Sequence, residues 1–110
     1  MKSQIVFCQE KLKNAFLSLK NSKLHEERQI YRWLERAFVD LEENAFCGIQ
    51  IPKKLIPASY IQKYEIDNLW KYNLPNAWRL TYSIKGSEIK VVSIVVEWMS
   101  HKEYEKRFGY

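Results

Sequence analysis

Residues 78–84, with the sequence WRLTYSI, decide the fold class, because apolar and polar side chains alternate along them. Successive side chains of a β-strand point to opposite faces of the sheet. Arg79 therefore shares one face with Thr81 and Ser83, whereas the apolar face consists of Trp78, Leu80, Tyr82 and Ile84. An arginine at this place either lies on a solvated face or is directed at a negatively charged group, and the rest of the chain has to decide between the two.

The same period of two continues before and after this strand. Residues 68–74 (NLWKYNL) predict a preceding strand, and residues 89–98 (IKVVSIVVEW) predict a following one. Because the last strand is apolar on nearly both faces, we expect it to lie in the centre of the sheet. The three strands are expected to form an antiparallel meander.

A tight turn is expected between the second and third of these strands. Residues 85–88 (KGSE) place Gly86 where a primed hairpin turn requires a positive φ. The place of the turn sets the register of the two strands. The predicted pairs are Ile84 with Ile89, and Arg79 with Ile94.

The first half of the chain follows a helical period instead. Residues 4–8 form a short apolar run that predicts a strand, and residues 9–20 and 23–46 then carry apolar side chains three and four positions apart. These apolar stripes are Leu12, Ala15, Phe16 and Leu19 in the first helix and Ile30, Trp33, Leu34, Ala37, Phe38 and Leu41 in the second. Gly48 is the expected stop of the second helix. Two amphipathic helices joined by a short break predict an antiparallel hairpin.

Two segments are less regular. Pro52 and Pro57 interrupt any regular element in residues 49–67, which we expect to form an ordered loop over the domain with a short helical turn or two. Residues 99–110 have the pattern of a short, polar helical tail.

Together these elements predict one small α+β domain spanning residues 1–110. An N-terminal strand and a helical hairpin are expected to pack on the antiparallel meander, with the first strand beside the last. The hairpin covers one face of the sheet. The opposite face is then expected to hold Arg79 and to face a partner.

The composition predicts a globular chain with an anionic partner. Hydrophobic residues make up 46% of the chain, which is enough for a core. Of the net charge of +5, residues 1–52 contribute +1 (eight Lys and Arg, seven Asp and Glu) and residues 53–110 contribute +4 (ten against six). Neither a secretory signal pattern nor a membrane-spanning stretch is found, so we expect a cytoplasmic protein.

Metal and disulfide sites are not expected. Cys8 and Cys47 are the only cysteines and form no Cys-x-x-Cys pair, so they are read as reduced thiols. His25 and His101 are far apart in sequence, and no ligand cluster surrounds either. We therefore expect no metal and no other cofactor.

Two stretches resemble the RelE/ParE superfamily of toxins from bacterial and archaeal toxin–antitoxin pairs. Residues 74–82 (LPNAWRLTY) are similar to the family's strand with Arg-Leu-hydrophobic-Tyr, and residues 97–108 (EWMSHKEYEKRF) are similar to its closing strand followed by His-x-x-Tyr. The order of strand, two helices and three strands is also similar. The resemblance implies a RelE-like fold and the toxin of a type II toxin–antitoxin system. For the RelE-like branch it implies a metal-independent mRNA endoribonuclease, often acting on ribosome-bound message.

In that chemistry a ribose 2′-hydroxyl attacks its own phosphate, which requires a base, an acid and cations. The resemblance implies that Arg79 holds the scissile phosphate through its planar guanidinium. His101 is the expected base or acid, because histidine titrates near neutral pH. Tyr104 matches the tail tyrosine that stacks on a base or donates a proton. The structural alternatives are an arginine paired with Glu97 or solvent, a passive histidine, and a tyrosine packed against the sheet edge.

Three further cations are candidates for substrate phosphates. They are Lys53, Lys54 and Arg107, and for the two lysines the alternative is a solvated surface pair. Glu97 departs from the family pattern, because some members carry arginines in the segment before the tail tyrosine. A carboxylate near a phosphate is unfavourable unless it acts as a base or pairs with Arg79.

Three functions stay open from the sequence. The first is an mRNA-cleaving toxin neutralised by a cognate antitoxin protein. The second is a ParE-like inhibitor of DNA gyrase, against which the His-x-x-Tyr tail argues. The third is a catalytically inactive binding protein with a RelE fold. The aromatic residues that would form a groove for an antitoxin helix, or else belong to the core, are Tyr60, Tyr64, Trp70 and Tyr72.

Overall fold

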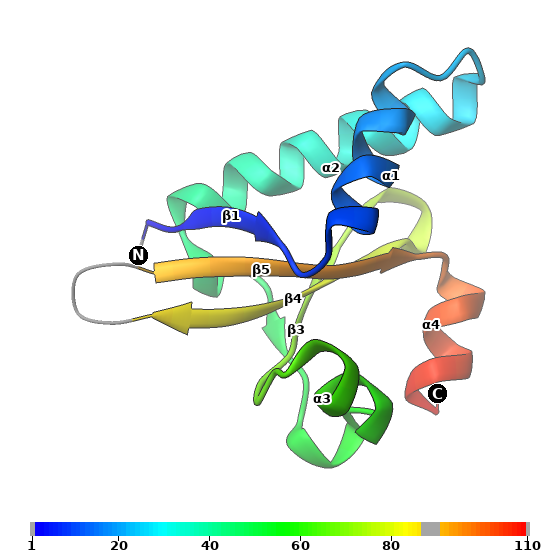
Figure 1. Ribbon diagram of the computed structural model, residues 1–110. Helices are drawn as coiled ribbons and strands as arrows, with labels where there is room; N and C mark the ends of the chain where they lie inside the picture. Colours follow the sequence, from blue (N-terminus) through cyan, green and yellow to red (C-terminus); the bar gives the residue numbers. More distant parts are fainter. Residues whose placement is uncertain (1, 87–90, 110) are drawn as a thin grey trace.

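The architecture is a five-stranded mixed sheet with helices on both faces (Figure 1). The computed structural model describes residues 2–86 and 91–109. The strands are β1 (Gln4–Phe7), β2 (Ile49–Gln50), β3 (Trp70–Asn73), β4 (Arg79–Gly86) and β5 (Val91–Met99), in the spatial order β1-β5-β4-β3-β2. The helices are α1 (Glu10–Lys20), α2 (His25–Glu43), α3 (Ala58–Tyr64) and α4 (His101–Phe108), with short 3-10 helices η1 (Ala45–Cys47), η2 (Lys53–Leu55) and η3 (Pro75–Ala77). The predicted α+β class, helical hairpin, meander and helical tail are confirmed.

β5 is an interior strand, second from one edge of the sheet, with a neighbour on each side as its apolar sequence predicts, and β4 takes the middle of the five-strand order. β4 pairs with it antiparallel on one side, and β1 pairs with it parallel on the other. Both faces of β5 are buried: Val95 lies in the core against α2, and Val96 lies in the core on the opposite face. A strand buried on both faces needs apolar residues at consecutive positions, which explains its composition.

The register of the β4–β5 hairpin differs from the prediction. The predicted pairs Ile84–Ile89 and Arg79–Ile94 are wrong, and the observed pairs are Ile84–Ser93 and Arg79–Met99. The reason is that β4 continues through Gly86, the residue expected in the turn. A bulge between Thr81 and Tyr82 then shifts the register once more. The expected turn extends into residues 87–90, which lie outside the described residues.

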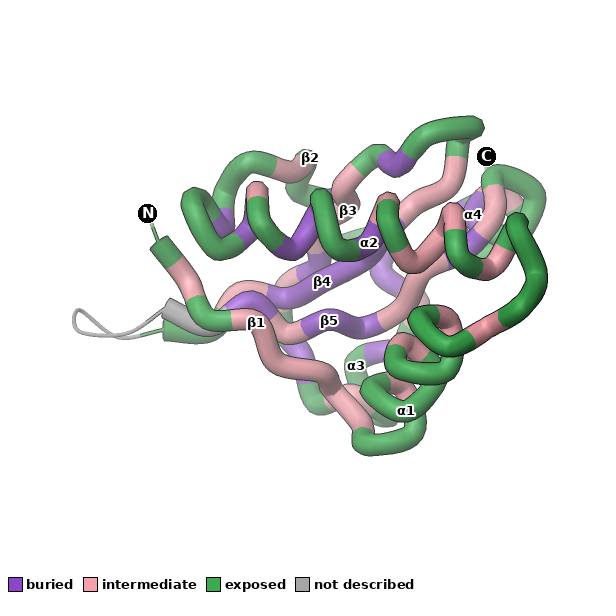
Figure 2. Tube along the Cα trace, turned by 90° about the horizontal axis from the view of Figure 1, so that it is seen from above, coloured by how far each residue is buried: buried purple, intermediate pink, exposed green. Residues whose placement is uncertain are grey.

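α1 and α2 cover one face of the sheet, as predicted for the hairpin (Figure 1). Figure 2 shows buried residues gathered in α2 and in β4 and β5 beneath it. Leu34, Ala37, Phe38 and Leu41 form the buried stripe of α2. The Phe16 ring of α1 lies 5.6 Å from the Phe7 ring and 5.1 Å from the Phe38 ring. Burial of each such large apolar side chain stabilises the fold by about 1.5–3 kcal/mol.

Gly48 has a different role from the predicted helix stop. α2 ends at Glu43, and the extended backbone of Asn44 follows it. The N–H of Gly48 donates to Tyr82 Oη at 3.1 Å. A Cβ at this position would lie 2.5 Å from the carbonyl oxygen of Lys71. The residue is therefore a glycine because another backbone approaches it closely.

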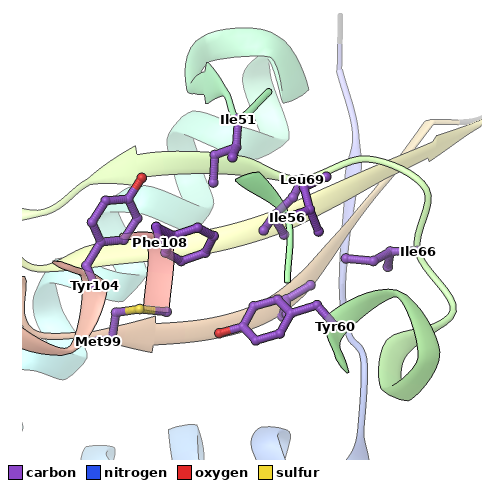
Figure 3. Packing of buried hydrophobic residues seen from close by; sticks show 9 residues of the cluster. Ile51, Ile56, Tyr60, Ile66, Leu69, Met99, Tyr104 and Phe108 are labelled. Atoms are coloured by element: carbon purple, nitrogen blue, oxygen red, sulfur yellow. The ribbon is translucent and has the colours of Figure 1, made fainter. Parts of the chain in front are cut away.

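The opposite face of the sheet, which the sequence predicts to be free for a partner, is covered as well. Residues 49–67 are not a loop alone but contain β2, η2 and α3. Pro52 and Pro57 stand immediately before η2 and α3, where a proline does not interrupt a helix. The second core under α3 and α4 consists of Ile51, Ile56, Tyr60, Ile66, Leu69, Val96, Met99, Tyr104 and Phe108 (Figure 3).

Candidate anion-binding site

Arg79 begins β4 on the face of the sheet that α4 covers. The alternation predicted for this strand is confirmed, because Trp78, Leu80, Tyr82 and Ile84 all pack in the core beneath α1 and α2. On the other face Thr81 is 0% exposed and Ser83 is 2% exposed. Thr81 Oγ1 donates to the Glu97 carbonyl oxygen at 3.2 Å. Arg79 thus ends a buried polar row and does not lie on a solvated face.

The Arg79 guanidinium has unused donor capacity. Its Nη1 donates to the Trp78 carbonyl oxygen at 3.1 Å, and its Cζ lies 5.5 Å from the centroid of the Tyr104 ring. Its Nε is buried and makes no hydrogen bond within the described part of the chain. A buried donor without a partner costs about 1–3 kcal/mol, and more when it carries charge. An anion that reaches this nitrogen would remove that cost.

Lys71 in β3 is a second cation at the same place, and it is not among the site residues that the sequence predicts. It pairs with Thr81 of β4, so it lies on the same face of the sheet as Arg79. Its Nζ lies 5.2 Å from the centroid of the Tyr104 ring. Cation–π contacts of this kind contribute about 0.5–2 kcal/mol. The signal in the sequence is that Lys71 alternates with Trp70 and Tyr72.

Tyr104 joins these two cations to α4. Ser100 and Glu103 form a capping box at the start of α4, and the helix places Tyr104 and Phe108 on its buried face. The Tyr104 ring is 2% exposed and stacks on the Phe108 ring, with the centroids 4.6 Å apart. Figure 3 shows both rings beside Met99 at the end of β5. Because the ring is buried, a nucleotide base cannot stack on it in this arrangement, and its visible role is to hold Lys71 and Arg79.

Glu97 does not pair with Arg79. Its Oε1 lies 2.7 Å from Nη1 of Arg107, and its other carboxylate oxygen accepts a hydrogen bond from the Tyr60 hydroxyl. Burial and this hydrogen bond raise the pKa of Tyr60. Burial lowers the pKa of Arg107, but the combined effect of Glu97, Tyr60 and Glu103 is larger, so the pKa is raised overall. Nη2 of Arg107 also lies 3.7 Å from Oε2 of Glu103. The charge of Arg107 is thus neutralised by two carboxylates.

The other predicted site residues lie in exposed surroundings. His101 stands in the first turn of α4, and its Nε2 lies 2.7 Å from Oε1 of Glu105. Its side chain is 51% exposed. Lys53 and Lys54 are exposed on η2. Of the three predicted catalytic residues, Arg79 and Tyr104 are in contact, and His101 follows two positions after Met99, the strand partner of Arg79.

Of the two alternatives left open for the four aromatic residues, a groove for an antitoxin helix or the core, the structure shows the core. Tyr60 and Tyr64 pack in the core under α3, on one side of the sheet. Trp70 and Tyr72 pack in the core under α2, on the other side. The sheet separates the two pairs, so they cannot line one groove.

Neither metal ligands nor a disulfide organise the described residues. Among them, no group of three or more His, Cys, Asp or Glu side chains is placed to hold a metal ion. Cys8 and Cys47 are free thiols, and burial raises the pKa of both. None of the helices described here is long and apolar enough to cross a membrane. Comparisons with protein-family models, with curated proteins and with solved structures found no match for this chain.

Proposed function

We propose that the protein is a cytoplasmic mRNA-cleaving toxin with a RelE-like arrangement, neutralised by a separate antitoxin protein. The observation that carries the proposal is the convergence of Lys71 and Arg79 on the Tyr104 ring, with the buried Nε of Arg79 unused. A guanidinium and an ammonium side by side match the charge and donor geometry of a phosphodiester. The excess of +4 on residues 53–110, which contain all three residues, supports an anionic substrate.

In the proposed reaction the ribose 2′-oxygen attacks the adjacent phosphorus and the bond to the 5′-oxygen of the next nucleotide breaks. Lys71 and Arg79 stabilise the negative charge that develops on the phosphorane. His101 accepts the proton of the 2′-hydroxyl, with Glu105 orienting the imidazole. The Tyr104 ring positions both cations, and because its hydroxyl is buried, the leaving 5′-oxygen takes its proton from solvent. The products are a 2′,3′-cyclic phosphate and a free 5′-hydroxyl, and ribosome-bound mRNA is the proposed substrate.

A second candidate is a binding protein with the same fold and no chemistry. The observation that favours it is the neutralised Arg107, which removes one of the predicted phosphate-binding cations at the closing helix. A ParE-like gyrase inhibitor differs from both, because it would arrest growth and leave the message intact.

The test is induced expression of the chain with growth and message integrity as readouts. We expect wild type to arrest growth and cleave message, and Arg79→Ala and Lys71→Ala to lose about a hundredfold or more in cleavage rate. Arg28→Ala, which removes an exposed arginine of α2, is the matched control and retains activity. Growth arrest with intact message would favour the gyrase inhibitor. Absence of any effect from a folded wild type would favour the inactive binding protein.

A further inference from the structure

A hollow of about 420 Å³ lies between α2 and the end of β3. Its lining includes Arg32, Trp33, Arg36, Tyr72, Asn73 and Leu74. It lies at the border of the core under α2, and its walls are mainly aromatic and aliphatic with cations from α2. No step of the proposed reaction uses it.

The side chains of the hollow combine aromatic rings with arginines. Trp33 and Tyr72 are half-buried, and the Tyr72 hydroxyl is held by a hydrogen bond to Asp40. Arg32 is exposed and forms no ion pair with any described residue. Arg36 follows one helical turn later, 77% exposed, with a 3.6 Å contact to Asp40 that binds it weakly. Rings for stacking, with arginines beside them for phosphates, are the usual means of binding single-stranded nucleic acid.

The hollow lies on the α2 face of the sheet, opposite the Arg79 side chain, and it reaches the end of β3 that pairs with the start of β4. Asn73, in its wall, is the direct strand partner of Arg79. Trp33 also lines a neighbouring hollow of about 210 Å³ together with Trp78, the residue that precedes Arg79. An extended strand that leaves the hollow at Asn73 would reach Arg79 by turning around the end of β3, and on this route it avoids Glu26, which lines the neighbouring hollow.

We propose that this hollow is a second nucleotide subsite, in which one base of single-stranded RNA stacks against Trp33 and Tyr72. Arg32 and Arg36 contact the phosphates on either side of that base, and the strand continues past Asn73 to Arg79. The inference rests on the proposed function, because it extends the path of the same RNA. The pairing of Asn73 with Arg79 favours RNA over an acidic peptide, which has no reason to continue to a phosphate-binding arginine.

The experiment measures binding by fluorescence anisotropy of a fluorescein-labelled, 12-nucleotide 2′-O-methyl RNA, which lacks the attacking hydroxyl and cannot be cleaved. Trp33→Leu is expected to weaken binding about tenfold, and Trp33→Phe, which keeps a stacking ring, is expected to restore most of it. The double variant Arg32→Gln, Arg36→Gln is expected to reduce the slope of log affinity against log salt by about 0.7 for each phosphate that it no longer neutralises. Arg28→Gln is the matched control and leaves both quantities unchanged.

Each outcome decides the assignment. Unchanged RNA affinity of the Trp33→Leu variant overturns the subsite. An unchanged salt slope of the double arginine variant also overturns it, and this measurement decides even if the Trp33→Leu variant fails to fold. Tighter, Trp33-dependent binding of a fluorescein-labelled glutamate-rich peptide overturns RNA as the occupant. If wild type cleaves message and Trp33→Leu does not change RNA binding, the subsite is refuted and the proposed nuclease function is not. If RNA binding depends on Trp33 but wild type does not cleave message, the nuclease function is refuted and the subsite is not.

Discussion

Replacement of Gly48 by alanine is expected to destabilise the fold by about 1.5–4.5 kcal/mol, the sum of an overpacking cost and a weakened hydrogen bond. The new Cβ would lie 2.5 Å from the Lys71 carbonyl oxygen and 2.5 Å from Tyr82 Oη, whereas ordinary contacts are 3.4–4 Å. Neither atom can move freely, because Lys71 belongs to the paired strand β3 and Tyr82 is 0% exposed with its hydroxyl bonded to the Ala45 carbonyl oxygen at 2.8 Å. Overpacking costs about 1–3 kcal/mol. Loss of the hydrogen bond from Gly48 N–H to Tyr82 Oη adds about 0.5–1.5 kcal/mol.

Urea denaturation followed by circular dichroism measures this cost. Gly109→Ala is the control, because Gly109 has φ +75° and no atom lies within 4 Å of the place that a Cβ would take, so only the left-handed backbone is penalised, by about 1 kcal/mol. In a Tyr82→Phe background one of the two close approaches is gone, so Gly48→Ala is expected to cost less there than in wild type. A Gly48→Ala variant within about 0.5 kcal/mol of wild type would refute the close-approach argument.

Three other properties follow from the structure. Burial, with a hydrogen bond to a carboxylate, raises the pKa of Tyr72 to about 12. The contribution of the protonated Tyr72 hydroxyl to the free energy of unfolding is therefore complete below the ordinary tyrosine pKa of 10.0, and it is lost as the pH rises from there towards 12. Tyr72→Phe should therefore flatten the fall in the free energy of unfolding over that window in urea titrations, and an unchanged slope would contradict this. Arg107→Met is expected to cost about 1–2 kcal/mol in the same assay, because it removes the ion-pair partner of the half-buried Glu97, and a neutral result would count against that pair. Exposed Cys47 should be alkylated faster at pH 8 than half-buried Cys8, as followed by mass spectrometry, and equal rates would show that Cys8 is more accessible than described.

The candidate site was only in part predictable from the sequence. Arg79 and Tyr104 stand out through their motifs, and the structure brings them into contact. Lys71 does not stand out, because a lysine alternating with aromatic residues is equally consistent with a solvated strand face. The partner of Glu97 is Arg107 and not Arg79, and this choice depends on how α4 turns back onto the sheet. Contacts between residues far apart in sequence leave no local periodic signal.

The sequence by itself determined the elements: alternation defines β4, the apolar run defines β5 as an interior strand, and the helical stripes define α1 and α2. These patterns are local, because side-chain direction repeats every two residues in a strand and every 3.6 in a helix. Only the tertiary structure decided the β4–β5 register, the covering of the second face by α3 and α4, and the convergence of Lys71, Arg79 and Tyr104. Those features depend on which surfaces bury the most apolar area against each other, and that is a property of the whole chain and not of any one segment.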